Sequence, residues 1–289
     1  MSTNLSLRVL GPADSALHPA YCDYVAQVFI QADFRRWCDW QQWGEDYRAF
    51  CLFDGERVLA NASAWRMRLR VDGVETEGFQ LGAVGCLPEF RGQGLARQAM
   101  QAALAHCGDA PVFLFCNETV LEFYPRFGFS PAPQHLFAAD CVATPEGAPA
   151  PIVDLADAAV RDAFLRAAAA ARPVSERFAA RDYGRIATWY AANGYASPLR
   201  RLDEDTWVFA QAEDGALLIE DVFARGPVDV PAMIGRLIDA PIHSLRLGFT
   251  PERLWPRAVA VGVEDDAGLF VRNLAVLAQP HRFPLLART

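Results

Sequence analysis

The chain has 289 residues, of which 52% are hydrophobic and 21% are charged, and its formal net charge is -8. This composition is typical of a globular protein with a sizeable core and excludes a mainly disordered chain. The acidic balance disfavours tight non-specific binding to nucleic acid, which requires clustered positive charge. The chain contains no lysine, which excludes a Walker-type phosphate loop and a lysine Schiff base.

The spacing of the cysteines and the pattern of the N-terminus indicate in which cellular compartment the protein is expected. All seven cysteines lie in the first half, and none forms a C-x-x-C pair, so neither a zinc site nor a secreted disulfide scaffold is indicated. The N-terminus lacks the pattern of a secretory signal, and no apolar run is long enough to span a bilayer. We therefore expect a cytoplasmic protein with reduced cysteines, without a metal and without a membrane partner.

The first half contains helical and extended patterns in turn. Apolar periodicity predicts a helix over 20–29. Trp37, Trp40 and Trp43 are three residues apart, so a helix would place them on one face, either in packing or as a wall of an acceptor pocket. The remaining pattern predicts strands over 48–53, 58–71, 75–87 and 112–116, a hairpin turn at 72–73, a helix over 95–106, a short helix over 119–127 and a strand from 129.

The second half repeats this order of elements. A segment rich in proline and small residues, 143–151, is the best linker candidate. After it the sequence predicts helices over 154–171 and 181–192, a hairpin of 207–212 with 216–224, a helix over 230–238 and a strand over 244–249. The expected domains are therefore 1–142 and 152–289, with the linker 143–151 between them.

The stretch 81–97 joins an apolar strand, a proline, a glycine loop and a helix. Gly92 and Gly94 allow a ligand to approach the main chain, and the N–H groups at a helix start favour an anion. A pyrophosphate fits such a site. Two nearby glycines alone more often form an ordinary turn, and the loop lacks the G-x-G-x-x-G pattern of dinucleotide sites.

Together with a second motif, this loop resembles the GCN5-related N-acetyltransferase (GNAT) superfamily. That family has a phosphate loop of the form Arg/Gln-x-x-Gly-x-Gly/Ala, and later an Asn that closes the next strand before a Tyr-x-x-x-Gly-Phe ending. The matching residues are Arg91, Gly94, Ala96, Asn117, Tyr124, Gly128 and Phe129. Within the superfamily the chain is most similar to the enhanced-intracellular-survival type, which carries a degenerate second half, although this chain is shorter.

The resemblance implies an α/β (α+β) GNAT fold, with a mixed, mostly antiparallel sheet and flanking helices, followed by a degenerate GNAT-like domain. It implies a transferase that moves an acetyl group from acetyl-CoA directly to a primary amine of a small molecule or peptide. Tyr124 would lie near the thioester sulfur as the catalytic acid. The implied cofactor-binding residues are Val84, Gly85, Cys86, Arg91, Gly92, Gln93, Gly94, Leu95, Ala96, Arg97 and Asn117.

Several alternatives stay open. An intact loop also fits a non-catalytic acyl-CoA sensor or interaction module, or an acyltransferase that uses another acyl-CoA. Asn117 can cap a helix as well as contact the cofactor. The general base is either a water chain ending on an acid or, as in the survival-type relatives, a terminal carboxylate, here that of Thr289. The oligomeric state is open, with a homodimer as one option.

Overall fold

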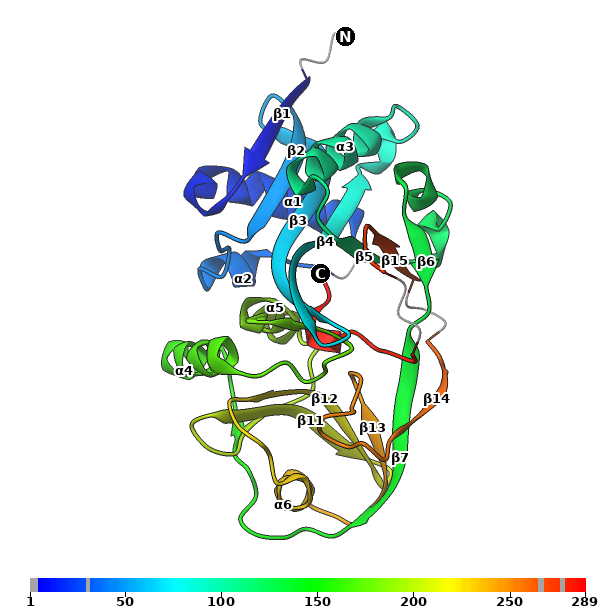
Figure 1. Ribbon diagram of the computed structural model, residues 1–289. Helices are drawn as coiled ribbons and strands as arrows, with labels where there is room; N and C mark the ends of the chain where they lie inside the picture. The colour runs from blue at the N-terminus through cyan, green and yellow to red at the C-terminus, as the bar shows by residue number, and fades with distance from the viewer. Residues whose placement is uncertain (1–4, 30–31, 265–267, 276–278) are drawn as a thin grey trace.

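The chain folds into two β-sheets, one from each half, with helices between and around them (Figure 1). The structure, a computed structural model, describes residues 5–29, 32–264, 268–275 and 279–289. The first sheet contains, in spatial order, β1 (Leu5–Leu10), β2 (Tyr47–Asp54), β3 (Arg57–Val71), β4 (Val74–Cys86), β5 (Val112–Cys116), β15 (Gly268–Arg272) and β6 (Ser130–Ala132), and β9 (Phe178–Arg181) pairs with β3. The second contains, in order, β14 (Val259–Val263), β7 (His135–Ala143), β13 (Ile242–Leu247), β12 (Ala216–Ala224), β11 (Thr206–Glu213), β10 (Leu199–Arg201) and β8 (Ile152–Val153).

The two sheets share one topology. Each is antiparallel except for one described pair of parallel neighbours, β4 with β5 in the first sheet and β12 with β13 in the second. Parallel strands need a crossover connection, which α3 (Leu95–Cys107) supplies in the first half and α6 (Val230–Leu237) in the second. The predicted mixed, mostly antiparallel sheet with flanking helices is thereby confirmed, and the second half repeats it.

The sheets also exchange strands, and besides the two named next, β9 of the second half pairs with β3 of the first sheet. β7, from the first half, pairs with β13 in the second sheet, whereas β15, from the second half, lies between β5 and β6 in the first sheet. Each sheet is therefore completed by a segment distant in sequence. The division into 1–142, 143–151 and 152–289 stays a prediction, and the strand pairing crosses it in both directions.

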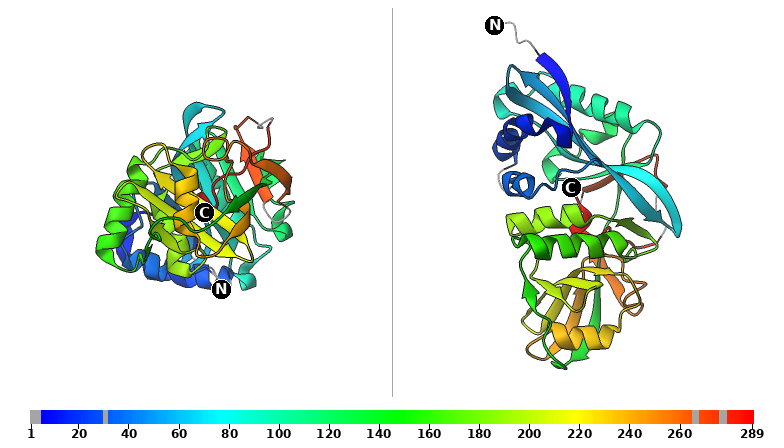
Figure 2. Two further views of the ribbon diagram at one scale, coloured as in Figure 1. Left: turned by 90° about the horizontal axis from the view of Figure 1, so that it is seen from below. Right: turned by 90° about the vertical axis from the view of Figure 1, so that its left-hand side faces the viewer.

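Helices cover both faces of the first sheet and fill the space between the sheets. Two views place α4 (Ala158–Ala170) and α5 (Gly184–Asn193) between the two sheets (Figures 1 and 2). α1 (His18–Val28) packs on the first sheet, and α2 (Arg35–Asp39) packs against α5. None of the described helices is both long and apolar enough to cross a bilayer.

The three tryptophans do not share one helix face. The helix α2 ends at Asp39, and Gln41 has a φ of +58°, so Trp40 and Trp43 lie outside α2. Residues 119–127 do not form one helix but two short 3-10 turns, η3 (Glu118–Val120) and η4 (Tyr124–Phe127). Pro125 lacks an N–H and stands at the start of the second turn, which prevents a continuous α-helix.

An aromatic cluster joins the halves in one core. Phe113 on β5, Phe178 on β9 and Phe283 near the C-terminus have ring centroids 4.7 to 5.3 Å apart. These separations are favourable for aromatic pairs, and all three side chains are fully buried. The first sheet therefore packs against residues from the end of the chain.

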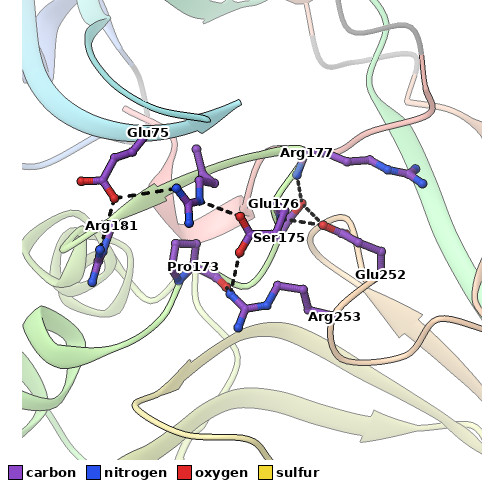
Figure 3. Close-up of polar contacts among 9 residues, drawn as sticks. Glu75, Pro173, Ser175, Glu176, Arg177, Arg181, Glu252 and Arg253 are labelled. Atoms are coloured by element: carbon purple, nitrogen blue, oxygen red, sulfur yellow. Dashed lines mark hydrogen bonds and ion pairs between the residues drawn. The ribbon is translucent and has the colours of Figure 1, made fainter. Parts of the chain in front are cut away.

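A charged network holds the tip of the β3–β4 hairpin to the second half (Figure 3). Arg70 forms an ion pair of 2.6 Å with Glu176, which also pairs with Arg253 at 3.2 Å. Glu75 accepts a hydrogen bond of 3.2 Å from Arg181. These side chains are partly exposed, so each pair contributes at most about 1 kcal/mol, and the network chiefly orients the hairpin.

Candidate active site

A cavity of about 680 Å³ opens between the two halves of the chain. Its walls come from α1, the segment before β2, the end of β4, the loop before α3, the end of β5 with the turns that follow, α5, and the last two residues. The predicted site residues that line it are Val84, Gly85, Cys86, Arg91, Ala96, Asn117 and Tyr124. The predicted residues Gly92, Gln93, Gly94, Leu95 and Arg97 are adjacent in the loop and first turn of α3, outside the described lining.

The end of β4 separates from β5 at the cavity. The described pairing of these strands stops at Leu81 and Leu114, although both strands continue. On its other side β4 has a register shift, where Ala83 takes a φ of +48° and its carbonyl accepts a 2.9 Å hydrogen bond from the buried Asn61 side chain. This bulge redirects the strand, so Val84–Cys86 presents main chain that an extended ligand can pair with.

The loop before α3 has the geometry of an anion site. Gly92 and Gly94 have φ values of +79° and +78°, which glycine adopts without strain, and a Cβ at either would meet no other atom within 4 Å. Gly94 is the N-cap of α3 and offers no capping side chain. The first N–H groups of α3 therefore lack a side-chain acceptor, and with Arg91 they favour a phosphate group.

Asn117 and Tyr124 follow β5, as the motif predicts. The Asn117 Oδ1 accepts hydrogen bonds from the Thr119 N–H at 3.1 Å and the Thr119 hydroxyl at 2.6 Å, so this side chain caps η3. Tyr124 is 5% exposed and packs against Phe129 and Phe270. Burial raises the pKa of the Tyr124 phenol, so the hydroxyl stays protonated and remains a proton donor.

Two cysteines beside the cavity are not activated. Burial raises the pKa of both the Cys86 and Cys116 thiols. The thiolate is the nucleophilic form, so both residues fit the role of small buried side chains. All seven cysteines are free in the structure.

The aromatic stretch divides between the cavity and the outer packing. Phe34, Trp37 and Tyr47 belong to the cavity wall, and the Phe34 ring lies 5.6 Å from Trp189 of α5. Trp40 instead stacks on the guanidinium of Arg161 at 4.9 Å. The stretch therefore contributes to the cavity wall and to packing through different residues, and its role in an acceptor pocket stays a prediction. The helix α5 contributes a wall that no sequence motif indicated.

The last three residues are clamped inside the cavity. The buried Gln80 side chain donates a 2.8 Å hydrogen bond to the carbonyl of Ala287 and accepts a 2.6 Å bond from the Thr289 N–H. The Tyr190 hydroxyl donates to the carbonyl of Arg288 at 3.0 Å. Sequence reasoning named Thr289 but missed Gln80 and Tyr190, because no local pattern reports contacts between residues 98 to 209 positions apart.

Arg288 brings a positive charge that is already paired. Its Nη2 donates to Glu264 at 2.8 Å, and Arg282 donates to the same carboxylate at 2.5 Å. Burial raises the pKa of Glu264, but the charges of Arg288 and Arg282 outweigh it and lower that pKa. The guanidinium also lies over the Phe115 ring at 4.5 Å, which fixes its position at the cavity edge.

Comparison with known proteins relates this site to one family. Residues 12–132 match the family model described as an acetyltransferase (GNAT) domain. Eis1 from Mycobacterium abscessus is 15% identical with a TM-score of 0.59, covering 92% of this chain and 72% of that one. A GCN5-related N-acetyltransferase from Kribbella flavida is 17% identical with a TM-score of 0.53, covering 92% and 71%. No curated protein matches the chain. At these identities the solved structures establish a shared fold.

Proposed function

Because residues 12–132 of this chain belong to the GNAT acetyltransferase family, we propose that it transfers an acetyl group from acetyl-CoA directly to a primary amine of a small molecule or peptide. The observation that carries the proposal is the cavity that both halves share. It joins the free end of β4, Arg91, Asn117 and Tyr124 on one wall to an aromatic wall on the other. Such an arrangement holds a donor and an acceptor together, which direct transfer requires.

Donor binding is assigned to the first half. The main chain of Val84–Cys86 pairs with the pantetheine arm, and the loop from Arg91 through the first turn of α3 holds the pyrophosphate. In the second half, the matching connection between β12 and α6 contains Pro227, which lacks an N–H, and the acidic Asp229, which caps α6. We assign one acetyl-CoA to each chain, in the first half.

The reaction forms a bond between the amine nitrogen and the acetyl carbon and breaks the thioester C–S bond. The amine proton passes to a base, and the departing thiolate takes a proton from the Tyr124 hydroxyl. Among the described residues that line the cavity, no side chain is a carboxylate. Where Thr289 is the last residue of the chain, its α-carboxylate is the proposed base, held in place by Gln80.

The position of Thr289 can be tested at Gly82. A Cβ at this position would lie 3.1 Å from the Thr289 carbonyl carbon and 2.8 Å from its hydroxyl. Gly82→Ala should therefore displace the tail and lower kcat, while the affinity for CoA, measured by calorimetry, stays near that of the wild type. Unchanged kcat in the folded Gly82→Ala variant would exclude a catalytic role for Thr289.

The function itself is tested by incubating the full chain with acetyl-CoA and a panel of primary amines while free thiol is followed. Amine-dependent thiol release, with the acetylated amine identified by mass spectrometry, is the expected result. CoA binding without turnover of any amine would instead identify a non-catalytic sensor. A faster reaction with propionyl-CoA or succinyl-CoA than with acetyl-CoA would reassign the donor.

A further inference from the structure

The acceptor side of the cavity is built from apolar and aromatic side chains of both halves. Phe29 and Phe34 come from the segment after α1, and Ile186 and Trp189 come from α5. Phe34 and Trp189 are half-buried, so their surfaces are partly available to a ligand. Their rings lie 5.6 Å apart and are inclined at 51°, which leaves both able to contact the same apolar group.

The side-chain charge at this wall is positive. Among the described residues that line the cavity, the charged side chains are Arg91, on the donor wall, and Arg288. Glu264 pairs with Arg288 at 2.8 Å and also with Arg282, so two guanidinium groups share one carboxylate and the net side-chain charge beside this wall stays positive. The proposed α-carboxylate of Thr289 matches one ammonium group. Nothing in this described wall matches a second or third ammonium group, and burying an unpaired cation is costly.

The apolar wall also favours the reactive form of an amine. Removal from water disfavours the ammonium ion relative to the neutral amine, so a single amino group becomes easier to deprotonate there. A polycation would carry further charges into the same surroundings without a counter-ion. From this chemistry, and resting on the function proposed above, we infer that the acceptor is a primary amine on an aromatic or bulky apolar body, such as an arylalkylamine, and not a polyamine.

The test compares tryptamine and 2-phenylethylamine with spermidine, using the full chain, saturating acetyl-CoA and release of free thiol. The expected result is a kcat/KM for the arylalkylamines that exceeds that for spermidine by roughly tenfold or more. Equal or faster turnover of spermidine would overturn the inference and leave the acetyltransferase activity standing. CoA binding without turnover of any amine would overturn the activity, and the inference with it.

Variants of the wall provide the second measurement. Trp189→Ala and Phe34→Ala should each lower kcat/KM for tryptamine by roughly tenfold or more, chiefly through KM, and Trp189→Phe should restore most of the loss. Trp40→Ala is the matched control, because this ring stacks on Arg161 and does not line the cavity. Calorimetry with CoA checks that each variant is folded. Unchanged tryptamine kinetics in both alanine variants would refute the assignment of this wall.

Discussion

Tyr124 is the residue whose hydroxyl has the most specific proposed role. Tyr124→Phe keeps the ring and its contacts with Phe129 and Phe270 and removes only the hydroxyl. General acid catalysis contributes roughly 100- to 10,000-fold, so kcat should fall by about that factor while the affinity for acetyl-CoA changes little. Stopped-flow thiol release and calorimetry measure the two quantities. A variant that keeps nearly full kcat at a saturating amine would make Tyr124 a packing residue.

Asp221 is a buried acid outside the site that makes stability depend on pH. Its Oδ1 accepts hydrogen bonds from the Tyr183 hydroxyl at 2.7 Å and the Val222 N–H at 2.9 Å, and burial raises its pKa to about 7. The ordinary pKa of an aspartate is 3.8. Between pH 3.8 and about pH 7 the Asp221 carboxyl therefore keeps its proton in the folded state and loses it in the unfolded state. The stabilisation is therefore complete below about pH 4 and is lost as the pH rises through about 7.

Asp221→Asn removes this titration but keeps the hydrogen-bond acceptor. The free energy of unfolding of the variant, relative to that of the wild type, should rise with pH by up to about 1.4 kcal/mol per unit between pH 5 and 7 and level off above. Urea unfolding of both proteins at pH 5, 6, 7 and 8 measures the difference. A difference that does not change with pH would show that Asp221 ionises alike in both states.

At the scale of one element, two substitutions at Gly94, the N-cap of α3, separate the effect of an added negative charge from that of an added side chain. Gly94→Asp adds a side chain and a negative charge where the phosphates are assigned, and CoA binding should be abolished. Gly94→Asn is the matched control, since Asn has nearly the same size, tolerates a positive φ and is neutral. The Asn variant should bind CoA more tightly than the Asp variant in calorimetry. Equal affinity in both, close to that of the wild type, would reject the phosphate site.

The predicted strand and turn positions are confirmed where they depend only on neighbouring residues in the sequence. β5 has the predicted bounds, Val112–Cys116, and the 72–73 turn has positive φ at both Asp72 and Gly73, as a tight hairpin requires. The spacing of the tryptophans left open whether a helix carries all three, and in the structure only Trp37 lies in α2. Their positions are decided by partners elsewhere in the chain, among them the Arg185 carbonyl, which accepts a 2.8 Å hydrogen bond from the Trp37 Nε1.

At the scale of the whole molecule, strand exchange predicts that the halves do not fold alone. A fragment of residues 1–142 lacks β15, the partner of both β5 and β6, and lacks Phe178 and Phe283, which cover Phe113. It should expose this core and aggregate in size-exclusion chromatography. Two coexpressed pieces divided after Gly147 should instead purify together and bind CoA, because β7 and β15 join them. A monomeric 1–142 fragment that binds CoA would contradict this.

The sequence by itself determined most of the elements and the family motif. These follow from short-range rules: apolar periodicity, glycine at positive φ, and an N-cap at the start of a turn, all within about 15 residues. Val84, Arg91, Ala96 and Tyr124 all line the cavity, and the roles that the resemblance implies for them stay predictions.

Only the tertiary structure decided what faces the proposed phosphate loop. The exchange of β7 and β15, the aromatic wall completed by Trp189, and the clamp of Gln80 on Ala287 and Thr289 join residues far apart along the chain. Such contacts depend on how two sheets pack and on which buried polar groups find partners. The sequence around Gln80 has no pattern that indicates which residue its side chain will contact. The proposed acceptor side of the cavity therefore forms only when both halves are folded together.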